Sequence, residues 1–465
     1  MKTLIKNGRL VTSSDEFVAD LLIVDEKIAQ IGLNLDPTLA DQVYDASGLY
    51  VLPGGVDVHT HLSMEWRGTM TCDDFYTGHR AALFGGTTTH VDFSVQPRDG
   101  SLSDAIHHWH TKAAGKAIID YGFHVAITNL TDVVMAEIAQ LPSLGVTSIK
   151  MFMAYKDSLQ VDDMTMFKSM RVAAQSGVLS LVHAENGDAI EVLTADAIAA
   201  GQSEPIYHAI TRPAELEAEA TARAIWLAQV AGDAPLFVVH CTCSGALEAI
   251  RAARLRGQRV YAETCTHYLF FTQDDLNGTP DDAFNGAKFV CSPPLRTEQD
   301  SAELWTGLHT GDLSSVSTDH CPWNYGEQKQ MGRESFSKIP NGAPGIEDRL
   351  YMLWDAGVRQ GRMTPSRFVE LTATNPAKLF GMYPQKGTLA IGSDADILLW
   401  DGDATHTISA ATHHSAIDYN LFEGRTVQGK PQKIFLRGKL VVDGDQLLAE
   451  AGSGQFIHRG APLLI

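Results

Sequence analysis

The sequence lacks long apolar runs and contains little cysteine. No stretch of about 18 apolar residues occurs in its 465 residues, so no membrane span is predicted. The first residues contain no apolar signal core, so we expect no secretory signal. The six cysteines include no Cys-x-x-Cys pair, which argues against a disulfide framework and against a redox motif. We therefore expect free thiols, a reducing compartment and a cytoplasmic protein with no membrane partner.

Basic residues are also in the minority. Lys and Arg number 36 against 56 Asp and Glu, which gives a formal net charge of −20. Nucleic-acid binding requires a basic surface, so this balance argues against such a partner. Hydrophobic residues make up 44% of the chain, as in an ordinary globular protein. No internal repeat or low-complexity tract is evident.

The two ends of the chain share a pattern of short, strand-like runs. Short alternating runs separated by turn residues lie at 3–6, 21–24 and 28–31, and similar runs return at 395–400, 433–436 and 439–442. We expect one smaller β-sandwich domain built from both termini, with a larger domain inserted between them. The predicted boundaries are 1–52 for the first part of the sandwich, 53–384 for the inserted domain, and 385–465 for the second part and the tail.

The inserted domain alternates apolar strands with helical segments, which is typical of a parallel α/β sheet. Eight strands followed by crossover helices favour a closed (β/α)8 barrel of the TIM type over an open sheet. The predicted strands are residues 55–61, 88–93, 122–127, 148–153, 179–183, 236–240, 259–264 and 316–319.

Polar residues gather at the carboxyl ends of these strands, where active sites of barrels lie. A single histidine or lysine in such a place is more often a core or surface residue, but four histidines at equivalent strand ends favour a shared metal site. The predicted ligands are His59, His61, Lys150, His183, His240 and Asp319.

The His59-Thr60-His61 step places two imidazoles on one face of a strand, because residues i and i+2 point the same way. Lys150 does not fit as an ammonium, since a buried cation repels metals. Reaction with carbon dioxide resolves the conflict, because it gives a carbamate (N6-carboxylysine) whose two oxygens bridge two metals about 3.5–4 Å apart. Imidazole, carboxylate and carbamate together suit zinc best, with manganese or cobalt as alternatives.

Asp319 has two expected roles, as a metal ligand and as the group that moves a proton, beside a metal-bridging hydroxide that acts as nucleophile. An aspartate at a strand end also caps helices, which is the simpler interpretation. The next two residues, His320 and Cys321, are left out of the site, because strand alternation turns His320 away.

These residues, in this order, resemble the amidohydrolase superfamily, and in particular its dihydropyrimidinase/hydantoinase branch. The likeness runs over nearly the whole chain, and its more specific segments are Ser-Pro-Pro-Leu-Arg at 292–296 and Pro-Asn-Gly-Ala-Pro-Gly at 340–345. The resemblance implies a hydrolase that opens dihydropyrimidines such as dihydrouracil, or 5-substituted hydantoins, to N-carbamoyl amino acids. It also implies a homotetramer.

The resemblance further implies roles for individual residues. His59, His61 and Asp319 would hold one metal, His183 and His240 the other, and carboxylated Lys150 would bridge them. Tyr155 matches the tyrosine that donates to the developing oxyanion. Backbone groups of Ser292 and Asn341 would hold the amide edge of the ring. We expect the pocket for the exocyclic group to be walled by Leu62, Met64, Trp66, Phe152 and Leu159.

Three alternatives remain open. Dihydroorotase and allantoinase use the same metal cage. A dihydroorotase usually has an arginine shortly after its His-x-His to hold a carboxylate, whereas Leu62 and Ser63 follow here. Arg67 weakens that objection, because a flexible loop brings it within reach. A non-catalytic scaffold relative would have lost metal ligands, and all six positions are intact.

Overall fold

A computed structural model describes all residues, 1–465. Its centre is an eight-stranded parallel sheet in which each strand pairs with the next one along the chain. All residues of these strands are buried except Val95, as expected for a parallel sheet covered on both faces. The strands are β6 (Gly55–Thr60), β9 (Thr87–Val95), β10 (Asp120–Ile127), β11 (Ser148–Phe152), β12 (Leu179–His183), β13 (Leu236–Val238), β14 (Val260–Cys265) and β15 (Ser315–Ser317).

The first and last strands meet and close the sheet into a barrel. An isolated bridge pairs Thr60 with His320 just beyond β15, and the His61 N–H donates to the His320 carbonyl at 2.9 Å. The fully buried Arg349 guanidinium spans the same seam, because it donates to the Val56 and Val316 carbonyls, each at 3.0 Å. The predicted barrel is confirmed.

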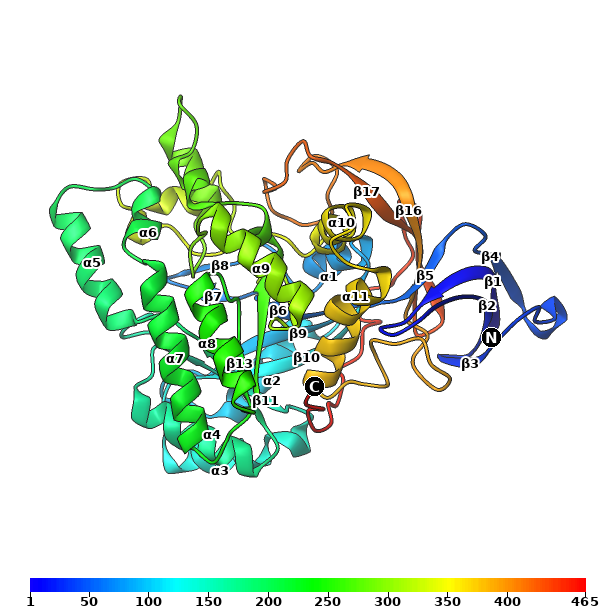
Figure 1. The fold of residues 1–465 in the computed structure, drawn as a ribbon, viewed down its shortest axis with the longest axis horizontal. Helices are drawn as coiled ribbons and strands as arrows, with labels where there is room; N and C mark the ends of the chain where they lie inside the picture. The colour runs from blue at the N-terminus through cyan, green and yellow to red at the C-terminus, as the bar shows by residue number, and fades with distance from the viewer.

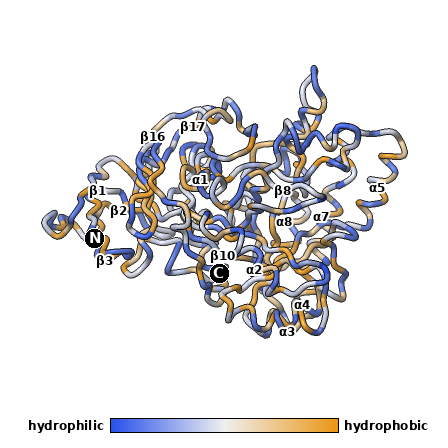
Figure 2. The backbone as a smooth tube through the Cα atoms, turned by 180° about the vertical axis from the view of Figure 1, so that it is seen from behind, coloured by the Kyte–Doolittle hydropathy of each residue, from blue (hydrophilic) through white to orange (hydrophobic).

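Helices surround the barrel, and capping residues fix where several of them begin. Ser101 and Asp104 form a capping box at the start of α2, and Asp162 caps α4. In Figure 2 much of the hydrophobic colour lies around β10 and α2, and the outer loops are largely hydrophilic. The α-helices are α1 (Thr77–Phe84), α2 (Leu102–Ala113), α3 (Asp132–Gln140), α4 (Asp163–Gln175), α5 (Gly187–Ala199), α6 (Ile206–Ile210), α7 (Ala214–Val230), α8 (Ser244–Leu255), α9 (Glu298–Thr310), α10 (Arg349–Leu353), α11 (Pro365–Val369) and α12 (Asn375–Leu379).

The two ends of the chain form a second, mixed sheet beside the barrel, where blue and orange strands lie together in Figure 1. In this sheet β5 pairs parallel with β1 and antiparallel with β16, which joins the two termini. A β unit built from both ends is therefore confirmed. Its strands are β1 (Lys2–Val11), β2 (Glu16–Val24), β3 (Lys27–Gly32), β4 (Gln42–Asp45), β5 (Tyr50–Pro53), β16 (Ile397–Thr407), β17 (Thr426–Leu436), β18 (Lys439–Asp443) and β19 (Gln446–Leu447).

The last residues leave this sheet and return to the barrel. Phe456 bridges to Tyr121 at the start of β10, and Ile457 joins the buried cluster that contains Val56, Val91 and Leu179. These contacts lie at the end of the barrel opposite to the strand ends that carry the predicted ligands. The C-terminal segment thus seals the floor of the barrel.

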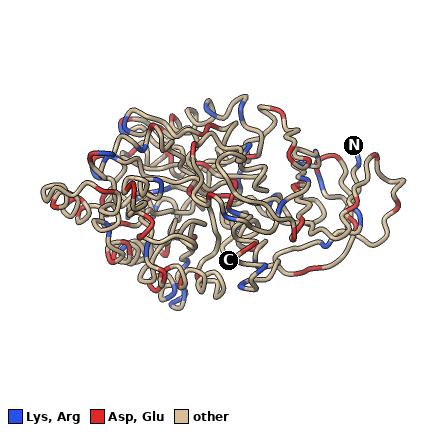
Figure 3. The backbone as a smooth tube through the Cα atoms, turned by 90° about the horizontal axis from the view of Figure 1, so that it is seen from above, with Lys and Arg blue, Asp and Glu red and all other residues tan.

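Two sequence-based expectations concern the chain as a whole. We propose the division 1–52, 53–384 and 385–465 as domains, with the first boundary inside β5 and the second ahead of β16. No helix combines the length and the apolarity that a membrane span needs. In Figure 3 the basic segments are scattered among more numerous acidic ones.

Candidate active site at the carboxyl end of the barrel

A cavity of about 200 Å³ opens at the carboxyl end of the barrel. Of the fourteen residues predicted for the site, all line this cavity except His59 and Leu62. His59 lies directly beneath it, in contact with Lys150 and Asp319. The structure therefore brings together residues that lie as far as 282 positions apart in the sequence (His59 to Asn341).

The strands that carry two of the predicted ligands end earlier than expected. The backbone turns into the left-handed region at His240 (φ 39°) and at Asp319 (φ 47°), so β13 and β15 stop two residues before them. Such a conformation is costly for a residue with a side chain, and it is found where neighbouring structure over-determines it. Both side chains are turned toward the centre of the site.

One group of donors surrounds the Asp319 carboxylate. Oδ1 of Asp319 lies 3.1 Å from Nε2 of His59 and 3.0 Å from Nε2 of His61. Nζ of Lys150 is 3.1 Å from the same nitrogen of His59. Ligand atoms of His59, His240 and Asp319 all lie within 4.8 Å of one another. This spacing suits a bound cation.

The second group is a pair of imidazoles, with Nδ1 of His183 2.8 Å from Nε2 of His240. The other ring nitrogen of His183 donates to Glu185 at 2.8 Å, which leaves Nδ1 unprotonated, with its lone pair directed toward His240. Buried ring nitrogens of His61 and His240 (Nδ1 in each) have no hydrogen-bond partner. In both residues it is Nε2 that contacts the other donors, and the converging imidazoles and carboxylate fit divalent metal ions of the zinc type.

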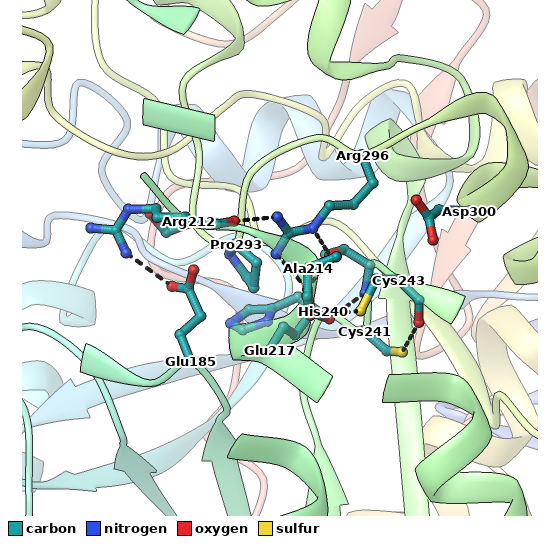
Figure 4. Close-up of polar contacts among 12 residues, drawn as sticks. Glu185, Arg212, Ala214, Glu217, His240, Cys241, Cys243, Pro293, Arg296 and Asp300 are labelled. Atoms are coloured by element: carbon teal, nitrogen blue, oxygen red, sulfur yellow. Dashed lines mark hydrogen bonds and ion pairs between the residues drawn. The ribbon is translucent and has the colours of Figure 1, made fainter. Parts of the chain in front are cut away.

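Two carboxylates that the sequence analysis did not predict orient the histidines. Glu263 accepts from Nδ1 of His59 at 2.5 Å, and Glu185 accepts from His183. Arg212 pairs with Glu185 at 3.2 Å (Figure 4). Carboxylates that hold the second nitrogen of a ligand histidine fix its tautomer and its ring orientation. Glu185 follows His183 by two residues, so only this one of the two pairings could be anticipated from neighbouring positions in the sequence.

The charges of the site follow from burial and from these contacts. Burial alone lowers the pKa of a histidine, and it brings that of His61 to about 4 despite the Asp319 carboxylate. Burial and Lys150 also lower the pKa of His59, but Asp319 and Glu263 outweigh them and leave it above its usual value. The same histidines hold the pKa of Asp319 well below 3.8 against the opposing effect of burial. Asp319 is therefore anionic at neutral pH.

Lys150 lacks the two kinds of contact that usually stabilise a charged lysine, namely solvent and a carboxylate partner. Its side chain is 1% exposed, so it does not reach solvent, and it forms no ion pair with a carboxylate. Burial lowers its pKa to about 8. The neutral amine, which is the form that reacts with carbon dioxide, is consequently within reach near neutral pH.

Tyr155 sits on the loop after β11 with a left-handed backbone (φ 71°), and its carbonyl accepts from the N–H groups of Ser158, Leu159 and Gln160. The residue is partly exposed, but its ring reaches inward to 5.2 Å from the His183 ring. Desolvation of the phenol raises its pKa to about 12, so it keeps its proton and remains a donor.

Ser292 and Asn341 lie side by side in the cavity wall, where Nδ2 of Asn341 donates to Oγ of Ser292 at 3.0 Å. The carbonyls on either side of Ser292 are both occupied, Cys291 by His208 and Pro293 by Tyr268. The Ser292 carbonyl itself accepts no hydrogen bond, and the Asn341 N–H donates none. A backbone acceptor and a backbone donor are thus left free beside the cavity.

The predicted pocket walls divide into two groups. Met64, Trp66, Phe152 and Leu159 line the cavity. Leu62 does not, and its placement as a wall is wrong: it is fully buried and packs against Gly78 of α1. The chain has already turned away from the barrel mouth after His61, so the Leu62 side chain points into the core.

Three further residues, His320, Cys321 and Arg67, differ in whether they reach the cavity. His320 turns away from the cavity, as alternation predicts, and its Nε2 donates to Asp73 at 2.9 Å. Cys321 lines the cavity, contrary to the expectation that it lies outside the site. Arg67 also reaches the cavity, with its guanidinium 4.6 Å from the Trp66 ring centre.

The barrel and its donor cluster define a class of protein, the (β/α)8 barrels that hold metal ions at the carboxyl ends of their strands. Comparison with known proteins narrows the class. Residues 50–441 match the model of the amidohydrolase family. The D-hydantoinases of Geobacillus stearothermophilus and Ralstonia pickettii are 49% and 48% identical to this chain, over 99% of it and 97% and 99% of their own lengths.

A solved structure agrees with these matches. The crystal structure of a dihydropyrimidinase from Brevibacillus agri NCHU1002 superposes with a TM-score of 0.97 at 50% identity, and the match covers 99% of each chain. The chain belongs to the amidohydrolase family. The predicted resemblance to the dihydropyrimidinase/hydantoinase branch, and with it the predicted enzyme class, is confirmed.

Proposed function

We propose that this protein opens the ring of neutral cyclic amides, 5-substituted hydantoins first and dihydropyrimidines such as dihydrouracil second, and releases N-carbamoyl amino acids. One observation carries the proposal. The cavity that holds the donor cluster also presents a free carbonyl at Ser292 and a free N–H at Asn341. A ring amide offers the complementary N–H and C=O, and needs no charged partner.

The metal centre of the proposal uses the six predicted ligands. His59, His61 and Asp319 would hold one divalent ion and His183 and His240 the other, with Lys150 carboxylated by carbon dioxide between them. Zinc is the first candidate and manganese and cobalt the next. When bound, the two ions supply an activated water and polarise the scissile carbonyl.

The chain's own groups account for the remaining requirements. Asp319, anionic at the edge of the cavity, accepts a proton from the attacking water and delivers it to the leaving ring nitrogen. The Tyr155 hydroxyl, protonated at neutral pH, donates to the oxyanion that develops on the carbonyl. The Ser292 carbonyl and the Asn341 N–H hold the amide edge.

The apolar walls favour substituents without charge. Met64, Trp66, Phe152 and Leu159 would enclose an alkyl or aryl group at ring position 5. The names of the two D-hydantoinase relatives support preference for the D enantiomer. Arg67 at the cavity rim keeps an anionic ring such as dihydroorotate as the second candidate, since a guanidinium binds a carboxylate.

The test is a comparison of ring-opening rates on D- and L-phenylhydantoin, dihydrouracil, dihydroorotate and allantoin, after loading with zinc or manganese in the presence of bicarbonate. We expect D-phenylhydantoin to be the fastest, dihydrouracil to follow, and the other rings to remain intact. Hydrolysis of dihydroorotate or allantoin alone would reject the proposed substrate class. Absence of any turnover in metal-loaded protein would favour the scaffold alternative.

The proposal also includes a cellular setting and an assembly. Six free cysteines, five of them buried, support a reducing compartment such as the cytoplasm. Exposed apolar side chains on and near α5, among them Val192 and Ile210, support self-association, and we propose a homotetramer. Light scattering on the purified protein measures the oligomeric mass.

A further inference from the structure

Lys329 is a buried lysine that the proposed chemistry does not use. It begins a short 3-10 turn, η6 (Lys329–Gly332), and its side chain is fully buried. Its ammonium donates to three backbone carbonyls, Val290 at 2.9 Å and Pro340 and Gly342 at 2.8 Å each. All three protons are thus used, and no carboxylate lies within ion-pair distance of the amine.

The three acceptors belong to the two loops that flank the cavity. Val290 precedes Ser292 by two residues, and Pro340 and Gly342 lie on either side of Asn341. A direct bond from the Gly342 N–H to the Val290 carbonyl, at 3.0 Å, joins the loops at the same point. The ammonium therefore fixes the separation between the free carbonyl of Ser292 and the free N–H of Asn341.

The contact with Pro340 has a second effect. The Pro340 carbonyl and the Asn341 N–H belong to one peptide unit, in which electron density is shared across the C–N bond. A cation on the carbonyl oxygen draws density toward that oxygen and leaves the N–H more positive. Hydrogen bonds polarise one another in this way most strongly where the dielectric constant is low. The Asn341 N–H is consequently a stronger donor than an ordinary amide.

A neutral side chain of similar size would occupy the same space at a smaller free-energy cost of burial than an ammonium. Burial of an ammonium without a counter-charge is unfavourable and lowers the pKa of Lys329, but the three carbonyls around Nζ each accept one proton and so favour the charged form. Support of the two loops alone does not require a charge, whereas polarisation of the peptide does.

We infer that Lys329 is a positioning residue that clamps the two loops and strengthens the Asn341 N–H for binding a ring carbonyl of the substrate. The inference rests on the proposed function, because it assigns a role within the same site. Lys329 touches neither the substrate nor the metal ligands, so its effect falls on substrate binding.

The experiment compares Lys329→Met and Lys329→Gln with the metal-loaded wild-type enzyme on D-phenylhydantoin. We expect Lys329→Met to raise KM about tenfold or more, the usual effect of losing a hydrogen bond that involves a charged group. We expect kcat to change by less than about threefold, because binding is lost equally in the ground and transition states. Lys329→Gln, which keeps two donors, should fall between. Metal content should equal that of wild type.

Lys6→Met is the matched control, since Nζ of Lys6 also donates to a backbone carbonyl, Leu35 at 2.8 Å, but in the terminal sheet. It should lower the thermal midpoint without changing KM. If both Lys329 variants lower the midpoint and leave KM unchanged, or lose KM, kcat and metal together, Lys329 only supports the fold and the inference is overturned. If Lys329→Met fails to fold, Lys329→Gln and Lys329→Arg decide by the same criteria. If the wild type opens no ring, the proposed function fails instead.

Discussion

At the scale of single residues, the site contains groups whose pKa values are shifted by burial far from their ordinary values. Lys150 lies among histidines without a direct ion pair to a carboxylate, and Tyr155 retains its proton far above neutral pH. Perturbed groups of this kind cluster at functional sites, because catalysis needs protonation states that water does not provide.

Lys150→Ala should abolish metal-dependent turnover, with a loss of more than about a hundredfold, because the variant cannot form the carbamate that joins two metals. Short carboxylic acids added to the assay should restore part of the rate by occupying the vacated space. The matched control is Lys156→Ala, which removes an exposed lysine paired with Asp188 and should leave the rate unchanged. Full activity of Lys150→Ala without added acid contradicts the bridging role.

Glu185→Gln should weaken metal binding, because His183 loses the carboxylate that fixes its tautomer. Removal of such a partner typically costs about 10–100-fold in metal affinity. Metal analysis after dialysis against a weak chelator should show loss of one metal before the other. Glu219→Gln, on the exposed face of α7, serves as the control and should retain the wild-type metal content. Equal retention in both variants would show that Glu185 has no orienting role.

At the scale of secondary-structure elements, the left-handed turns at His240 and Asp319 show where sequence patterns stop being informative. Short, nearly continuous apolar runs between helical segments predict the eight barrel strands, because each strand is buried on both faces. The exact strand ends depend on contacts between loops, which leave no local pattern. Leu62 was misplaced for the same reason: its position after a strand suggested the cavity, but α1 packs over it.

Other parts of the site had no signal in the sequence at all. Glu263 holds His59 across 204 residues, and Lys329 ties together loops that follow different strands. The ligand histidines themselves were found because they recur at equivalent strand ends. Supporting residues occupy no such repeated position, and only the folded chain brings them to the ligands.

The terminal sheet provides a prediction about pH. Asp20 in β2 accepts from the N–H groups of Asn7 and Leu35 at 2.8 Å each. Burial opposes its ionisation, but these two donors together with the Lys6 ammonium, 3.3 Å from the carboxylate, outweigh burial and hold the pKa of Asp20 below its usual 3.8. Ionised Asp20 therefore stabilises the fold fully at pH values above its pKa in the unfolded chain. This stabilisation is lost as the pH falls through the lower pKa that Asp20 has in the folded protein.

Asp20→Asn should therefore be less stable than wild type by about 1–3 kcal/mol at pH 7, the cost of leaving a buried hydrogen-bonding group poorly satisfied. The difference should shrink as the pH is lowered toward and below 3.8. Thermal midpoints of both proteins measured from pH 7 down to about pH 2, which covers the interval below 3.8, check this. A gap that stays constant over the whole range would mean that Asp20 does not titrate differently in the folded state.

At the scale of the whole molecule, the barrel depends on the last residues of the chain. Ile457 is buried against the barrel floor, next to Val56 and Leu179. Ile457→Ala should lower the free energy of unfolding by about 2–4 kcal/mol, as for other large-to-small changes in a core. Leu463→Ala, at a side chain that is 51% exposed, is the control and should change little. Equal midpoints for the two variants would mean that the tail is not part of the core.

Because β5 pairs with β16, the terminal sheet can be completed only after most of the chain has been synthesised. The edge of β5 that receives β16 has no partner until the ribosome has translated residues 54–396. At about 5–20 residues per second this interval lasts tens of seconds. An unpaired strand edge is a template for association between chains. In a polysome, neighbouring nascent chains would present this same edge to one another, so overexpression should first yield intermolecular β-pairing through the N-terminal strands.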